Sequence, residues 1–344
     1  MAKQVIVQCV NICKLFFILI ISISFKQSTA QVKDGWITYF PSENYNNGKY
    51  IVLICGDQEY RSEEALPLLA RILSTENGFK TTVLFPINPE TGYVDPSVHN
   101  NILGLDHLEK ADLVIIFTRW LDLPKSQMRY IAEYLEKGKP VIGLRTATHA
   151  FRYPENSSSL FAKFGYDSKK KGWVNGFGKR VLGETWISHH GINYKQGTIG
   201  LINGALKLEG SPILRGVKNI WVKSGTYTSK SDVGQVLVWG MPTDGMERTS
   251  MIDRSNTMMP VAWIRYYTSD EGNKGKVFAT TMGAAVDLKD VNLRRLIVNA
   301  CYWALDMSSM IPKSGASVKL LRDYNPNMFG IGNYKKKLFP LDYK

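Results

Sequence analysis

Three short polar segments of this chain carry the side chains best suited to chemistry. Two of them hold three of the chain's five histidines: His149 in one, and the adjacent pair His189 and His190 in the other. The third segment, residues 56–61, carries two carboxylates and an arginine. Imidazole titrates near neutral pH and its neutral form binds divalent metals, so these histidines could serve as acid, base or ligand.

We predict that His149 is the general acid or base of a site, with Glu59 or Asp57 as its partner carboxylate. As an alternative, His149 could bind a divalent metal ion, the one cofactor that these residues suggest, together with His189 or His190 and a carboxylate such as Asp57 or Glu59. Neighbouring residues of a strand point in opposite directions, so only one histidine of the pair is expected to face the site. No ligand-spacing motif supports a metal, and a histidine that only braces its loop is a simpler interpretation.

We also predict five substrate-binding side chains in or next to these segments: Arg61, Arg119, Trp120, Arg145 and Thr148. A guanidinium offers several donors in a fixed geometry, which suits the oxygens of a hydroxyl-rich substrate. An indole face can stack on a sugar ring. The alternatives are salt bridges between the arginines and nearby carboxylates, and an indole that fills the core.

The sequence lacks the motifs of several well-known site classes. It has no Gly-rich phosphate loop, no Gly-x-Ser-x-Gly turn and no His-Glu-x-x-His stretch. The formal net charge is +13, yet the basic residues are dispersed, with runs only at residues 169–171 and 335–337. That pattern is typical of a solvated basic surface, so we expect no nucleic-acid partner.

The first 30 residues are predicted to be a secretory signal peptide and not part of the fold. Lys3 and Lys14 precede the apolar run 15–21, and the small residues that end at Ala30 fit a signal-peptidase site. The run is too short to cross a bilayer core about 30 Å thick, so no stable membrane insertion is expected after cleavage. We therefore expect a secreted or periplasmic protein, with an uncleaved membrane anchor as the alternative.

Cleavage after Ala30 leaves two cysteines, Cys55 and Cys301, each within an apolar stretch. This placement is more typical of buried free thiols than of a disulfide. A mature sequence so poor in cysteine suits a bacterial periplasm.

Residues 50–143 alternate between strand-like and helix-like segments. Apolar runs predict strands at residues 50–55, 79–85, 113–117 and 140–143, and amphipathic spacing predicts helices beginning at Ser62 and spanning 124–137. Such alternation implies parallel strands with right-handed crossovers. The polar residues 56–61, 118–120 and 145–151 directly follow three of these strands, so we expect them to meet at the carboxyl edge of the sheet.

We predict one α/β domain over residues 49–308, with a doubly wound, mostly parallel sheet flanked by helices. Residues 31–48 are expected to form an N-terminal extension, and residues 309–344 an extended basic tail. Residues 152–205 are expected to be a loop-rich insertion. Further strands are predicted at residues 220–223, 235–239, 261–265 and 277–280, and a closing helix at 290–305.

Several of these segments resemble the trehalose-utilisation (ThuA-like) family, whose fold is similar to that of class I glutamine amidotransferases. The resemblance runs from about Tyr50 to Leu305. It rests on the following stretches: Gly56-Asp57, Gly143 to Phe151, Val181 to Gly183 leading to His189-His190, Ser211 to Val217, Pro260 to Trp263, Gly275 to Phe278 and Thr281 to Gly283. Residues 56–67 and 145–151 look like those of the secreted subgroup common in environmental bacteria.

Two departures limit what the resemblance carries over. The amidotransferase nucleophile would be a cysteine in the turn after the fourth strand, where this chain has Arg145 and Thr146. The resemblance therefore implies the fold without glutaminase chemistry. Family members often carry histidines where Ser211 and Ala284 stand here, so the histidine-rich family site carries over only in part.

Together with the predicted signal peptide, the resemblance implies an exported enzyme that acts on a small carbohydrate, a disaccharide or an oxidised (3-keto) glycoside. In such a sugar the carbonyl acidifies the neighbouring C–H bond, so a single base could start elimination or isomerisation without a nucleophile. A non-catalytic saccharide-binding protein on the same fold is the alternative, and metal-dependent hydrolysis of an unrelated small molecule is a third. Whether the chain forms a homo-oligomer is left open.

Overall fold

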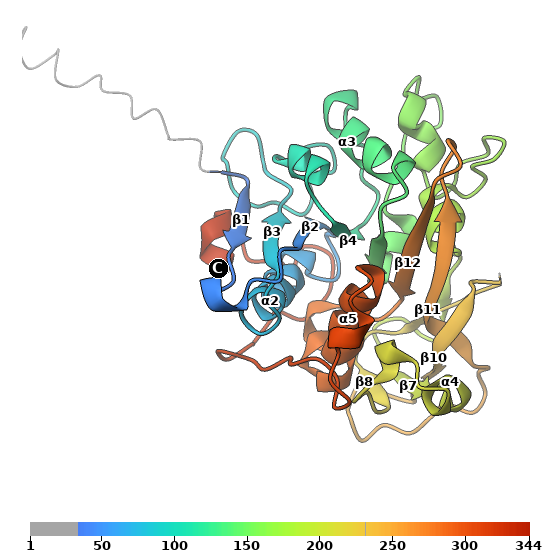
Figure 1. The fold of residues 1–344 in the computed structure, drawn as a ribbon. Coiled ribbons are helices and arrows are strands. Elements are labelled where there is room, and N and C mark those ends of the chain that lie inside the picture. Colours follow the sequence, from blue (N-terminus) through green and yellow to red (C-terminus); the bar gives the residue numbers. More distant parts are fainter. Residues whose placement is uncertain (1–33, 231) are drawn as a thin grey trace, which may run out of the picture. The chain divides into compact units, whose positions relative to one another are not determined.

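A mixed β-sheet organises the described part of the chain (Figure 1). The computed structural model describes residues 34–230 and 232–344, so the predicted signal peptide and its cleavage site lie outside the described residues. Ten strands within this part form one sheet in the order β1-β3-β2-β4-β5-β12-β11-β10-β7-β8. Their bounds are β1 (Trp36–Tyr39), β2 (Tyr50–Gly56), β3 (Lys80–Leu84), β4 (Leu113–Thr118), β5 (Val141–Leu144), β7 (Thr198–Ile202), β8 (Ile220–Val222), β10 (Gln235–Pro242), β11 (Met259–Thr268) and β12 (Lys274–Thr280).

The helices and minor elements connect and cover this sheet. The α-helices are α2 (Ser62–Thr75), α3 (Lys125–Glu136), α4 (Gly204–Leu208) and α5 (Val291–Ala304). The single-turn helices are η1 (Glu43–Tyr45), η2 (Leu105–Glu109), η3 (Arg145–His149), η4 (Leu160–Phe164), η5 (Gly178–Leu182), η6 (Pro212–Leu214), η7 (Ala285–Lys289), η8 (Ser308–Met310) and η9 (Pro340–Tyr343). A separate two-stranded ribbon pairs β6 (His189–His190) with β9 (Thr226–Tyr227). Among the described residues, no helix is both long and apolar enough to cross a membrane.

One half of the sheet is parallel and carries helices on both faces. The four pairings in the row β3-β2-β4-β5-β12 are all parallel. β2 is buried along its whole length, as its continuous apolar run predicts. Its side chains alternate between two cores, because successive residues of a strand point to opposite faces. Ile51 and Leu53 join the core shared with α2 and α5, whereas Val52 and Ile54 join the core shared with α3.

The other half of the sheet is antiparallel, so the prediction of a mostly parallel sheet is wrong there. All pairings in the row β12-β11-β10-β7-β8 are antiparallel. At the opposite edge of the sheet, β1 also pairs antiparallel with β3. β11 and β12 are joined by residues 269–273 alone, which is too short for the crossover that a parallel pair requires. The predicted loop-rich segment 152–205 is mostly irregular, but β7 at its end belongs to the main sheet.

The two mature cysteines are free and buried, as expected. Cys55 lies in β2 and Cys301 in α5, and both belong to the core between α2, α5 and the sheet.

Residues 309–344, predicted to be an extended tail, pack on the domain with little regular structure. Ile311, Val318 and Phe329 are buried in the core shared with α2. Near the first turn of α2, Lys335 of this tail forms an ion pair with Glu64 at 2.7 Å. The tail is therefore part of the folded domain.

Glu63 is fully buried where α2 meets the tail, and both of its carboxylate oxygens lack a hydrogen-bond partner among the described residues. Its nearest cation is Arg61, at 3.8 Å. Burial raises the pKa of Glu63 from 4.5 to about 8, against the opposing charge of Arg61. The folded protein therefore holds this carboxyl neutral at pH 7.

We predict that Glu63 destabilises the fold at alkaline pH. Because its folded pKa lies above its unfolded one, its contribution to stability is complete below pH 4.5 and is lost as pH rises to about 8. Glu63→Gln, which is permanently neutral, should match the wild type at pH 5 and exceed its thermal midpoint by about 5 °C at pH 9. The neighbouring Glu64→Gln serves as control and should show no alkaline gain, because Glu64 is paired with Lys335. Parallel alkaline losses in wild type and Glu63→Gln would contradict the assignment.

Candidate active site

The turn after β2 is held by a buried carboxylate. Asp57 has no exposed surface, and its Oδ1 accepts hydrogen bonds from the backbone N–H of Glu59 at 2.6 Å and of Tyr60 at 2.7 Å. Its Oδ2 accepts a hydrogen bond from the hydroxyl of Thr146, in the turn after β5. Burial raises the pKa of Asp57, while these hydrogen bonds oppose that rise. Asp57, predicted as a catalytic carboxylate, is thus occupied in tying two turns together.

Glu59 is a second buried carboxylate, which joins the turn after β2 to the turn after β4. Its Oε2 lies 3.3 Å from Nη2 of Arg119, which follows β4. Its Oε1 accepts a hydrogen bond of 2.5 Å from the hydroxyl of Tyr194. Its backbone carbonyl accepts from the N–H of Gly330 in the tail, at 2.8 Å. Two distant segments therefore fix the side chain of Glu59, and a third fixes its backbone.

Arg119 and Trp120 together form one wall of the site. The guanidinium of Arg119 lies 3.6 Å from the centroid of the Trp120 ring. Trp120 has a left-handed backbone with φ of 57°, which is costly for a bulky residue and is typical of functional turns. Its N–H donates to the carbonyl of His149 at 3.0 Å, so the turn after β4 is joined to the turn after β5.

Arg145 begins the turn after β5, also with a left-handed backbone (φ 48°). Its guanidinium lies between two aromatic rings, 4.2 Å from the centroid of Tyr60 and 4.1 Å from that of Tyr227. Its Nη1 donates to the carbonyls of Gly225 at 2.6 Å and Thr281 at 2.5 Å. With 1% of its surface exposed, Arg145 acts as a buried positive charge that positions loops. The prediction that it contacts substrate is not supported by this placement.

His149 lies at the centre of the site in an aromatic enclosure. Four ring centroids lie around its imidazole: Trp186 at 5.4 Å, Tyr227 at 6.0 Å, and Trp120 and Tyr166 at 6.2 Å each. Its Nδ1 is 3.3 Å from the hydroxyl of Thr148. Burial lowers the pKa of His149 well below its usual value, and the charges of Arg119 and Arg145 lower it further. The imidazole is therefore neutral around pH 7.

The paired histidines face different ways, as expected for neighbours in a strand. His189 packs against Tyr227, with ring centroids 5.3 Å apart. Burial and the charge of Arg145 lower its pKa to about 4, whereas the charge of Glu59 acts in the opposite sense. The imidazole of His189 is therefore near enough to Glu59 to be affected by its charge. The Nε2 atom of His190 instead lies 2.8 Å from the carbonyl of Thr257.

The proposed metal set of His149, His189 and His190 is not assembled in this arrangement. Among residues 34–230 and 232–344, no group of three or more His, Cys, Asp or Glu side chains converges to hold a metal ion. The physical reason is that His190 points to Thr257 and Asp57 is enclosed by hydrogen bonds.

Two other predicted substrate-binding residues serve the fold instead. Arg61 has no exposed surface, and its Nη2 donates to the carbonyls of Gln58 at 2.5 Å and Gly330 at 2.9 Å. It therefore joins the turn after β2 to the tail. Thr148 is 3% exposed and its hydroxyl meets the ring nitrogen of His149, so it orients the imidazole.

Sequence reasoning missed several aromatic residues of the site. They are Tyr166, Trp186, Tyr194, Tyr227 and, behind Tyr194, Phe329 of the tail. Trp186 could have been suspected, since it stands three residues before His189. The others come from segments with no local motif.

Three buried donors of the site have no hydrogen-bond partner within the described residues: Nη1 of Arg119, Nε1 of Trp120 and Nδ1 of His189. The last is a donor when that nitrogen carries the proton. Buried polar groups are normally paired, so unpaired donors that gather around one imidazole are typical of a binding site for an oxygen-rich ligand.

Comparison with known proteins gives a family and a pair of similar structures. The model of a family described as trehalose utilisation (ThuA) matches residues 52–304. A ThuA-like protein from Parabacteroides merdae is 16% identical, with 86% of this chain and 99% of that one covered and a TM-score of 0.46. A ThuA-like protein from Bacteroides uniformis is 13% identical, with 74% and 90% covered and a TM-score of 0.42. No curated protein matches the chain.

The geometry predicts that Asp57 is structural. Asp57→Ala would leave two backbone N–H groups and the Thr146 hydroxyl without their acceptor in a buried turn. We expect a loss of about 2–4 kcal/mol and a fall of several degrees in the thermal midpoint. Glu90→Gln, a substitution at an exposed carboxylate, is the control, and its midpoint should stay within about 1–2 °C of the wild type. An unchanged thermal midpoint in Asp57→Ala would contradict the structural role, and Asp57 would again be a candidate catalytic carboxylate.

Proposed function

Since this chain belongs to the ThuA family, whose model is described by trehalose utilisation and matches residues 52–304, we propose that it is an enzyme acting on a carbohydrate. The observation that carries this proposal is the gathering of unpaired donors, a held carboxylate and a neutral imidazole from loops far apart in the sequence. These groups are Arg119, Trp120, Glu59, His189 and His149. The predicted signal peptide in residues 1–30 supports an exported location.

The chemistry of the rim suits a sugar better than a charged metabolite. Sugar hydroxyls are neutral acceptors that can meet the free donors of Arg119 and His189. The flat rings of Trp120 and Trp186, both half-buried, offer apolar faces against which the C–H groups of a sugar pack. Polar edges with aromatic faces are the combination that a hydroxyl-rich ring requires.

For the reaction we propose elimination from an oxidised (3-keto) glycoside. Glu59 removes the proton from the carbon next to the carbonyl, and the electron pair forms a carbon–carbon double bond as the adjacent glycosidic C–O bond breaks. The carboxyl group then returns the proton to the departing oxygen, so the products are an unsaturated keto sugar and an alcohol. No nucleophile is required, which agrees with Arg145 and Thr146 in the turn after β5.

The charge that develops on the carbonyl oxygen is stabilised by N–H donors that have no acceptor of their own among the described residues. Arg119 offers a free N–H at this rim, and a neutral imidazole such as that of His149 polarises a carbonyl as a hydrogen-bond donor. His149 therefore acts in this proposal as an electrophilic hydrogen-bonding residue, and the depressed pKa keeps it in the neutral form.

The adjacent histidines provide a matched test of the site. With purified mature protein and a panel of 3-keto and ordinary disaccharides, His149→Ala, His189→Ala and Glu59→Gln should each lower turnover by about 10²-fold or more. His190→Ala should stay within about twofold of the wild type, because its ring nitrogen meets the Thr257 carbonyl and is directed away from His149.

Each of the following outcomes would contradict the proposed function or the proposed reaction. Saccharide binding without turnover in the wild type would replace the enzyme with a sugar-binding protein. Absence of both binding and turnover would overturn the carbohydrate role. Activity abolished by a chelator and restored by one added ion would overturn the metal-independent elimination.

A further inference from the structure

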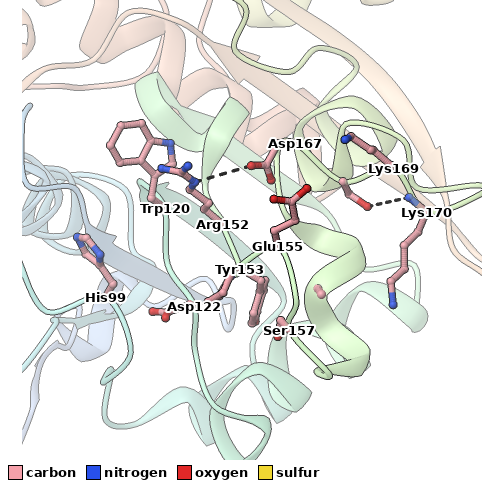
Figure 2. Close-up of a pocket in the computed structure, with 13 residues that line it drawn as sticks. His99, Trp120, Asp122, Arg152, Tyr153, Glu155, Ser157, Asp167, Lys169 and Lys170 are labelled. Carbon is pink, nitrogen blue, oxygen red and sulfur yellow. Dashed lines mark hydrogen bonds and ion pairs between the residues drawn. The ribbon is translucent and has the colours of Figure 1, made fainter.

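A cavity of about 820 Å³ lies beside the candidate active site, and Trp120 is the only one of the predicted site residues that lines it. It is bounded by the turn after β4 and by residues 152–170 (Figure 2). Its volume is within the range of small-molecule sites, roughly 300–1,000 Å³.

Trp120 is the wall common to this cavity and to the candidate active site. It lines the cavity, and its ring centroid lies 6.2 Å from that of His149. On one ring face it meets Arg119 at 3.6 Å, and Arg152 of the cavity lies 5.6 Å from the same ring. A molecule held at the rim by Arg119 could thus extend past the indole into the cavity.

The charges that line the cavity are balanced. Three cations and three carboxylates face it: Arg152, Lys169 and Lys170 against Asp122, Glu155 and Asp167. One pair of these, Arg152 and Asp167, is joined at 3.7 Å, as the dashed line in Figure 2 shows. A site for phosphate or another anion would carry an excess of positive charge, which is absent from this set. Alternating donors and acceptors instead match a neutral ligand with many hydroxyl groups.

Asp122 and Glu155 are the side chains best suited to bind such a ligand. Both line the cavity, and Figure 2 shows them on the wall that runs from Trp120 past Tyr153. The Tyr153 hydroxyl is already bonded to the carbonyl of Leu123 at 3.2 Å, so its ring serves as a rigid surface. A carboxylate accepts hydrogen bonds from two neighbouring hydroxyls of a sugar, and these bonds are stronger than those between neutral groups.

We propose that this cavity is a second sugar-binding subsite, which holds the part of the substrate that does not react. The substrate is then a glycoside of at least two sugar units that lies across Trp120, with its oxidised ring at Glu59 and His149 and its second ring between Asp122 and Glu155. This inference rests on the proposed carbohydrate function and adds the size of the substrate to it.

The test compares two substrates that share the same reacting ring. A 3-keto disaccharide fills both sites, whereas the corresponding 3-keto methyl glycoside fills only the first. The double variant Asp122→Asn/Glu155→Gln should raise KM for the disaccharide about tenfold or more and leave KM for the methyl glycoside within about twofold. The value of kcat should change little for either, since neither residue touches the reacting atoms. Glu90→Ala, an exposed carboxylate outside the cavity, is the control and should affect neither substrate.

The outcomes separate this inference from the function on which it rests. If both substrates are turned over and the double variant changes KM for both or for neither, the subsite is disproved and the proposed function stands. If the wild type neither binds nor converts either substrate, the proposed function itself fails. If the cavity binds inorganic phosphate more tightly than the disaccharide in a calorimetric titration, the cavity belongs to an anion and the inference is overturned.

Discussion

The hydrogen bonds around the carboxylate of Asp57 are the constraint on which the site depends. One buried side chain connects the turn after β2, which carries Glu59, with the turn after β5, which leads to His149. Burying a carboxylate is costly unless its oxygens are satisfied, and here both oxygens accept hydrogen bonds. Loss of this connection would allow Glu59 and the imidazole of His149 to move independently.

Segments that are distant in the sequence add further residues to the site at the carboxyl ends of the parallel strands. The tail supports Glu59 directly, because Gly330 donates to its carbonyl and Phe329 packs against both Tyr60 and Tyr194. The ribbon of β6 and β9 contributes His189 together with Tyr227. Arg145 lies between the rings of Tyr60 and Tyr227, and its charge adds to the effect of burial in lowering the pKa of both His149 and His189. The site is therefore a property of the whole domain.

The sequence was sufficient to predict the parts that local patterns determine. Apolar runs identified the parallel strands, and the rule that their carboxyl ends share an edge brought Glu59, Arg119 and His149 together. The sequence did not predict the features that depend on burial or on pairing between distant segments. Arg61 and Arg145 are buried against backbone carbonyls, which residue type alone does not reveal. The pairing of β7 with β10 and the pairing of His189 with Tyr227 join residues more than 30 positions apart in the sequence.

The central claim is that a sugar binds at the rim formed by Glu59, Arg119 and the two neutral histidines. A crystal structure with a non-reactive disaccharide tests it most directly. The account predicts one ring beside Trp120, with sugar oxygens about 3 Å from Nη1 of Arg119 and from a ring nitrogen of His189. A disaccharide bound elsewhere on the domain, with this rim free of ligand, would contradict it.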